Sequence, residues 1–192
     1  MNVKRVLIGV LVAAVCAVVI VAVAHQEPKP AAQQSLDAVF ADHQAGSTQR
    51  AAAAGVPASP QPSDTEVHTH AAVRILAQDG AMYQPPLGLG ISDRGAQLSI
   101  HTHDQTGVAH MHQPAGSPPF TLGQLMAVWG VAINDGALAG HPARLWVNGK
   151  QMPLTAKVAL NDRDDLVIAL DQPDLRKDPL PAFDWDAIPL AD

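Results

Sequence analysis

Histidines in the pattern His-x-His are the residues of this sequence best suited to chemistry. Three such pairs occur, and they are His68/His70, His101/His103 and His110/His112. Imidazole is the commonest protein ligand for zinc, copper, iron and nickel. Because side chains two residues apart on a strand project from the same face, each pair directs two ligands to one point if it lies on a strand.

Two of the pairs fall in a segment that predicts a β-hairpin. Residues 98–103 and 108–112 have strand character, and the turn-forming tetrapeptide Asp104–Gly107 joins them. With a four-residue turn, His101 lies opposite His110, and directly opposed residues share a face. A turn one residue longer or shorter would move the second pair to the other face. We therefore predict that the four hairpin histidines share a face, on the condition of this register.

The histidines define a candidate site for a zinc or copper ion. The predicted ligands are His101, His103, His110, His68, His70, His112 and Asp104. The first three form the core of the set, and the His68/His70 pair joins them if its strand, expected over residues 67–76, neighbours the hairpin. Asp104 could instead fix the tautomer of an imidazole. Cys16 is the only cysteine, so no thiolate cluster is expected.

Other polar or soft side chains near these motifs are expected to stay outside the site. Met111 offers a sulfur ligand, but strand alternation places it on the face opposite to the neighbouring histidines. His141 precedes a proline in a loop and is expected to be exposed to solvent. The acidic run Asp162–Asp165 is expected to form a solvated turn before a strand.

Three classes of function are compatible with such a site. The first is a metal-binding module, the second is an enzyme in which three histidines hold a metal and water takes the free position, and the third is a metal-free interaction domain. No catalytic residue is predicted, because no nucleophile elbow, Gly-rich phosphate loop or HExxH motif is present. The net charge of −6 and the lack of a basic patch argue against a nucleic-acid partner.

The N-terminal segment predicts a membrane anchor. Residues 6–24 form an unbroken apolar run, close to the about 20 residues that span a bilayer. Lys4 and Arg5 precede the run, so the N-terminus is expected in the cytoplasm and the remainder outside it. The predicted protein is therefore single-pass in the cell membrane, with the lipid bilayer as its partner. The alternative is a signal peptide cleaved after Ala24, although typical signal peptides have apolar cores of only about 7–15 residues.

Composition divides the rest of the chain into three parts. Residues 25–65 are rich in Ala, Gln, Pro and Ser and predict a disordered spacer. Residues 66–170 carry the strand and helix patterns of one histidine-rich domain. Residues 171–192 form a tail rich in Pro and Asp, which either packs through Phe183 and Trp185 or stays extended.

The element pattern of the domain predicts an α+β fold. Thr121 and Gln124 form a capping box before a short amphipathic helix that Gly130 ends. Asn148-Gly149 predicts a tight hairpin, and residues 166–170 predict a central strand. We expect a small mixed β-sheet with one short covering helix, in a β-grasp-like arrangement, and a small β-sandwich is the alternative.

The sequence also resembles an uncharacterised family of membrane-anchored bacterial proteins. That family pairs an early His-x-His with a later His-Thr-His-Asp-x-x-Gly-x-x-His, followed by Phe-Thr-Leu-Gly-Gln, Trp-Gly and Val-Asn-Gly. The matching positions here are residues 68–70, 101–110, 120–124, 129–130 and 147–149. The resemblance covers most of residues 66–170 and carries no activity with it. At His112 the family pattern has an acidic residue instead.

A second resemblance is confined to the hairpin. Gly95, followed after five residues by His101-Thr102-His103, resembles the opening of the first cupin motif. The glutamate which that motif next requires is absent, because Gly107 and Val108 occupy its positions. A cupin-type enzyme is therefore a secondary alternative.

Overall fold

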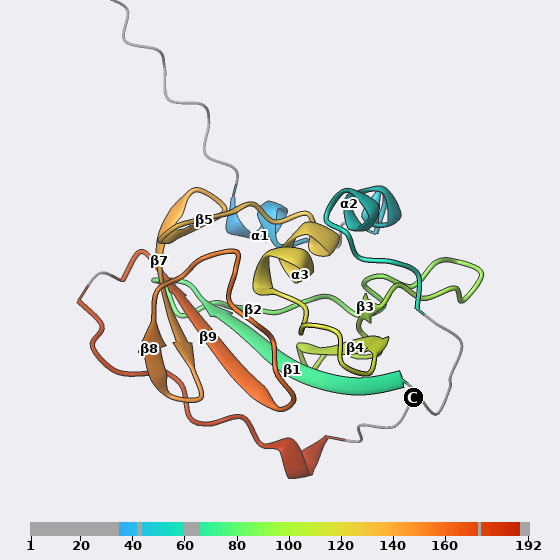
Figure 1. The fold of residues 1–192 in the computed structure, drawn as a ribbon. Coiled ribbons are helices and arrows are strands. Elements are labelled where there is room, and N and C mark those ends of the chain that lie inside the picture. The colour runs from blue at the N-terminus through green and yellow to red at the C-terminus, as the bar shows by residue number, and fades with distance from the viewer. Residues whose placement is uncertain (1–34, 42–43, 60–65, 173, 189–192) are drawn as a thin grey trace, which may run out of the picture. The chain divides into compact units, whose positions relative to one another are not determined.

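A mixed β-sheet with helices packed on one face forms the framework of the protein (Figure 1). The computed structural model describes residues 35–41, 44–59, 66–172 and 174–188. The described strands are β1 Glu66–Leu76, β2 Met82–Tyr83, β3 Ile100–His101, β4 Val108–Pro114, β5 Ile133–Asn134, β6 Ala137–Leu138, β7 His141–Val147, β8 Lys150–Met152 and β9 Asp164–Leu170. The described helices are α1 Leu36–Val39, α2 Ser47–Ala53, α3 Leu122–Trp129 and the 3₁₀ turn η1 Trp185–Ala187.

The strand order is β3-β4-β1-β9-β7-β6-β5, with β2 paired to β1 and β8 paired to β7. The β1–β9 pair is parallel and the other pairs are antiparallel. The predicted α+β class with a mixed sheet is confirmed. The sheet of nine strands is larger than a small β-grasp, because several two-residue strands that are too short to show a periodic pattern extend it.

Local sequence signals place the predicted helix and hairpin correctly. In α3, the Gln124 N–H donates to Thr121 Oγ1 over 3.3 Å and the Thr121 N–H donates to Gln124 Oε1 over 2.9 Å. Gly130 ends the helix with a φ of 90°. Asn148 and Gly149 have φ values of 52° and 75°, as a type I′ hairpin turn between β7 and β8 requires.

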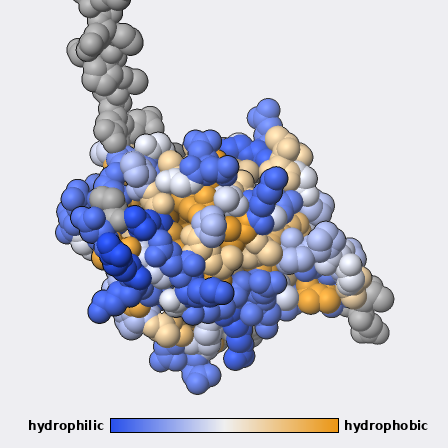
Figure 2. All heavy atoms as spheres, turned by 60° about the vertical axis from the view of Figure 1, so that its left-hand side comes forward, coloured by the Kyte–Doolittle hydropathy of each residue, from blue (hydrophilic) through white to orange (hydrophobic). Residues whose placement is uncertain are grey.

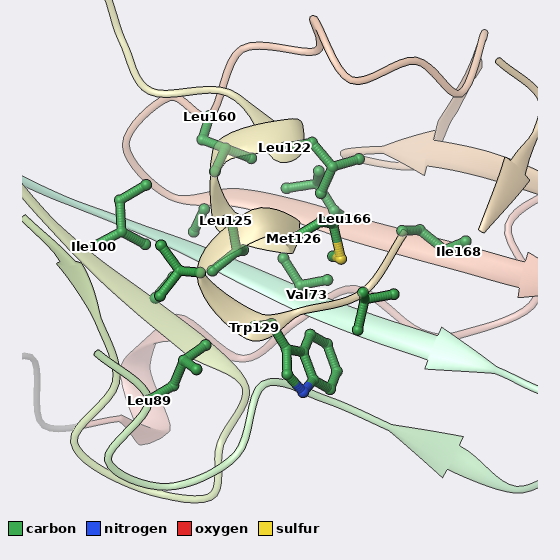
Figure 3. Close-up of a cluster of buried hydrophobic side chains, with 14 of the residues drawn as sticks. Val73, Leu89, Ile100, Leu122, Leu125, Met126, Trp129, Leu160, Leu166 and Ile168 are labelled. Atoms are coloured by element: carbon green, nitrogen blue, oxygen red, sulfur yellow. The ribbon is translucent and has the colours of Figure 1, made fainter. Parts of the chain in front are cut away.

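The main core lies between α3 and one face of the sheet (Figure 3). Its central side chains are Val73, Leu89, Ile100, Leu122, Leu125, Met126, Trp129, Leu160, Leu166 and Ile168. Strand residues two apart, such as Val73 and Ile75 on β1, alternate into this core. The neighbours between them point to the opposite face.

The spacer expected over residues 25–65 is folded where the structure describes it. Phe40, Ala51 and Val56 are buried in the main core. Arg50 donates through Nε to the Ala127 carbonyl (3.1 Å) and through Nη2 to the Val128 carbonyl (2.9 Å), which satisfies orphan acceptors at the end of α3. Low-complexity composition suggested disorder, but a short helix is stabilised once it docks on a core.

The sequence predicts a tail over residues 171–192. The part of it that the structure describes packs on the face of the sheet opposite to the main core. Leu175 and Leu180 pack against a small buried cluster formed by Trp146, Val167 and Ala169. Arg74 of β1 donates to the Asp165 carboxylate over 2.8 Å and to the Pro181 carbonyl over 2.8 Å. The guanidinium also lies over the Phe183 ring, 5.7 Å from its centroid. The tail therefore covers the part of this face formed by β1, β9 and β7.

The membrane anchor predicted over residues 6–24 lies outside the described residues. Among the residues that the structure describes, no helix is long and apolar enough to cross a bilayer.

Candidate metal centre

The histidines come from three adjacent strands, and their register decides where the side chains point. β4 pairs with β3 so that His110 lies opposite His101, which confirms the predicted register of the hairpin. On its other side β4 pairs with β1, where His70 lies opposite His110 and His68 lies opposite His112. The strand of the early pair is thus a direct neighbour of the hairpin.

Six imidazoles consequently gather on one face of β3, β4 and β1, and we call them the histidine cluster: His68, His70, His101, His103, His110 and His112. Its centre is His110, whose ring centroid lies 4.7 Å from that of His70 and 4.5 Å from that of His103. Met111 points to the opposite face and is 1% exposed in the main core, as the alternation predicted.

Three members of the cluster converge on one point and could hold a metal ion. One ring nitrogen each of His68, His70 and His110 lies within 4.8 Å of the others. His68 Nε2 and His110 Nδ1 are 3.2 Å apart. Ligands about 2.0–2.1 Å from a tetrahedral zinc ion lie about 3.4 Å from one another, so the distance between His68 and His110 already fits such an ion.

Burial keeps the central imidazole neutral. His110 is 3% exposed, and its pKa is lowered to about 3, first by desolvation and then by the neighbouring His70, His103, His101 and His68. A neutral imidazole is the form that binds metals, and His110 therefore stays available as a ligand at neutral pH.

Three histidines of the cluster have an oxygen atom next to Nδ1 that can accept a hydrogen bond. His101 Nδ1–H donates to the Leu98 carbonyl over 2.8 Å. His112 Nδ1 is hydrogen-bonded to the Glu66 carboxylate, and His70 Nδ1 lies 3.5 Å from Asp162 Oδ1. Metal-binding histidines characteristically donate one ring N–H to such an oxygen, which fixes the tautomer and leaves the other nitrogen for the ion.

Glu66 and Asp162 belong to the site, although neither is among the predicted ligands. Glu66 is two residues before His68 on β1, so the series Glu66-x-His68-x-His70 already contained the signal. The backbone N–H of His70 donates to Asp162 Oδ1 over 3.0 Å. No sequence pattern links these two distant residues.

The solvated turn expected over residues 162–165 is confirmed for Asp162 and Arg163, which are exposed and form a turn, but it is wrong for Asp164 and Asp165, which are buried at the start of β9. Asp164 and Asp165 are 6% and 5% exposed. Asp164 accepts from the Asn148 side-chain amide over 2.8 Å, and Asp165 binds Arg74. Tertiary hydrogen bonds, which a sequence pattern does not show, satisfy these carboxylates.

Asp104, a predicted ligand, and His141, which is expected to be exposed, each contact a residue outside the histidine cluster. Asp104 lies in the turn between β3 and β4, where its Oδ1 accepts the Thr106 N–H over 2.8 Å, and its role as a ligand stays a prediction. The expectation that His141 is exposed is wrong, because it is 8% exposed and its Nδ1 lies 2.7 Å from Asp171 Oδ2.

A surface groove lies away from the histidine cluster. It measures about 760 Å³ and is lined by Val147, Met152, Pro153 and Val158 with Lys150 and Lys157. Figure 2, which looks from the side that carries β7 and β8, shows apolar side chains gathered between hydrophilic ones. No histidine lines this groove, so its shape does not bear on the metal centre.

Comparison with known protein families, curated proteins and solved structures finds no match for this chain. Membership of the membrane-anchored bacterial family therefore stays a prediction.

Proposed function

We propose that this protein is a membrane-anchored, extracytoplasmic module that binds a transition-metal ion, zinc or copper, through His68, His70 and His110. The convergence of one nitrogen from each of these side chains within 4.8 Å carries the proposal. The ligands are fixed on two paired strands rather than on loops, which holds them in a preorganised geometry.

The chemistry of the donors supports zinc or copper. Imidazole nitrogens suit zinc, copper, iron and nickel, whereas thiolates and thioethers favour Cu(I). Met111, the methionine in the same strand segment, is held in the core on the opposite face. The triad therefore presents nitrogen without sulfur.

The membrane part of the proposal is supported by sequence. Lys4 and Arg5 precede the apolar run over residues 6–24, which is long enough for one span. The domain that carries the histidines would then lie outside the cytoplasm. A site without cysteine ligands suits an oxidising compartment, because it contains no thiol to be oxidised.

Metal content tests the ligand assignment. The full chain, kept in detergent, is loaded with Zn²⁺ or Cu²⁺, dialysed and analysed for bound metal, together with a His68→Gln/His110→Asn variant and a His141→Gln control. We expect the wild type and the control to retain metal and the double variant to lose the ion held by the triad. Circular dichroism checks that each protein is folded.

A wild-type protein that retains neither ion, and is not stabilised by either, would overturn the proposal. The histidine cluster would then be a metal-free, hydrogen-bonded network of an interaction domain. If metal is retained with a readily exchanged water, measured by water-proton relaxation with Cu²⁺, the same site would instead have the open position that a metal enzyme needs.

Anchoring is tested independently of metal. We expect the full chain to stay with membranes through an alkaline wash, and a chain that begins at residue 25 to be released. In intact cells, protease added from outside should degrade the histidine domain. Release of the full chain by the wash, or protection from the protease, would contradict the proposed location.

A further inference from the structure

A second pair of imidazoles approaches closely on the same face of the sheet. His101 Nε2 and His103 Nε2 are 3.0 Å apart, and the two rings meet at 87° with centroids 4.7 Å apart. His101 is fully buried. The pair thus points two ring nitrogens toward each other beside the triad.

The tautomer of His101 makes this pair suitable for a metal. A carbonyl oxygen can only accept, so the contact with Leu98 O places the proton of His101 on Nδ1. Its Nε2 then carries a lone pair directed at His103 Nε2. In the metal-free protein one proton on His103 can bridge the two nitrogens, and a metal ion would compete with that proton for the same lone pairs.

The spacing of the two nitrogens is that of neighbouring ligands around one ion. For an ion about 2.1 Å from both nitrogens, the N–metal–N angle would be about 90°. This angle is the one that square-planar and tetragonal Cu(II) or Ni(II) prefer, and a modest opening gives the tetrahedral angle of zinc.

The pair is also distinct from the triad. Among the residues that the structure describes, His68, His70 and His110 bring their ligand atoms together around one point. His101 and His103 are not part of that group. His110 stands between the two groups, with its ring centroid 4.5 Å from His103 and 4.7 Å from His70.

We propose that His101 and His103 form a second metal subsite, so that the domain binds two adjacent ions of the Zn²⁺ or Cu²⁺ class. This inference rests on the proposed function, because it extends the same histidine face. Two protein ligands leave coordination positions for water or another small ligand, so the second ion is held less tightly than the first. Repulsion between the adjacent cations weakens it further.

The stoichiometry of the full chain tests the subsite. Zn²⁺ is titrated into protein in detergent, and bound metal is measured for the wild type, His103→Gln, His68→Gln and the control His141→Gln. We expect two ions per chain in the wild type and the control. We expect one ion in each cluster variant, with the weaker ion missing in His103→Gln and the tighter ion missing in His68→Gln.

The possible failures separate the two proposals. One ion per wild-type chain overturns the second subsite, and the triad proposal then stands if that ion is lost in His68→Gln. No ion in the wild type overturns both. If a variant does not fold, the wild-type protein loaded with Cu²⁺ tests the second subsite instead. A second equivalent of Cu²⁺ should broaden the electron paramagnetic resonance signal of the first by spin–spin coupling. Two unbroadened signals would contradict adjacent ions.

Discussion

The two faces of β4 and β1 carry opposite chemistry at alternating residues of the same strands. On the face toward α3, Ala109 and Met111 of β4 pack with Val73 of β1 in an apolar core. On the other face, His110 and its neighbours pack ring against ring. Both faces are largely buried, so burial alone does not distinguish a structural surface from a candidate site. The difference is that burial of apolar groups stabilises the fold, whereas burial of ionisable groups costs free energy unless they are paired or bind a ligand.

The largest expected effect comes from the apolar face. Met111→Ala removes a side chain that is 1% exposed, and we expect the free energy of unfolding to fall by about 2–5 kcal/mol. Urea unfolding in the presence of a chelator measures this change. The folded variant should keep the zinc affinity of the wild type, and a large loss of affinity would mean that the two faces are not independent.

The second effect belongs to the histidine face. Zinc at 100 times its dissociation constant should stabilise the wild type by about 2.7 kcal/mol, since it binds only the folded chain. A chelator should remove this increment. Thermal unfolding should show that His110→Asn lacks the increment and that Met111→Ala retains it. An unchanged increment in His110→Asn would separate His110 from the metal centre.

Acid should also act through the histidine face. The pKa of His110 is lowered to about 3 in the folded protein, against an ordinary value of 6.5. Below pH 6.5, His110 therefore becomes protonated in the unfolded chain but stays neutral in the folded chain. The free energy of unfolding falls as the pH falls. For one proton the slope is at most about 1.4 kcal/mol per pH unit.

Urea unfolding without metal, from pH 6.5 to about 5, measures this slope. The slope should be smaller in His110→Asn, which cannot titrate at this position. Equal slopes in the two proteins would show that His110 is protonated in the fold as readily as in the unfolded chain.

The smallest effect is expected beside the cluster. Asp162→Asn keeps a hydrogen-bond acceptor for the His70 N–H but removes the negative charge 3.5 Å from His70 Nδ1. We expect zinc affinity to fall about tenfold, or about 1.4 kcal/mol. Asp93→Asn, in an exposed loop, makes the same charge change and should have no effect. Equal losses in both variants would indicate a general effect of net charge.

Short-range patterns in the sequence determined helix α3, the β7–β8 hairpin and the hairpin of β3 and β4 that carries four of the histidines. The alternation of strand residues assigned His110 and Met111 to opposite faces, and the four-residue turn fixed His101 opposite His110. The capping box and Gly130 fixed both ends of α3. These features depend on residues a few positions apart, so their physical causes are visible in the sequence.

The tertiary structure alone decided what joins this hairpin. The placement of β1 beside β4 adds His68 and His70, and the loop that contains Asp162 reaches His70 from 92 positions away. Strand order and loop docking follow from the free energy of the whole packed core, to which no single local pattern corresponds. The sequence by itself therefore determined that the histidines share faces, and the fold decided which of them share one place.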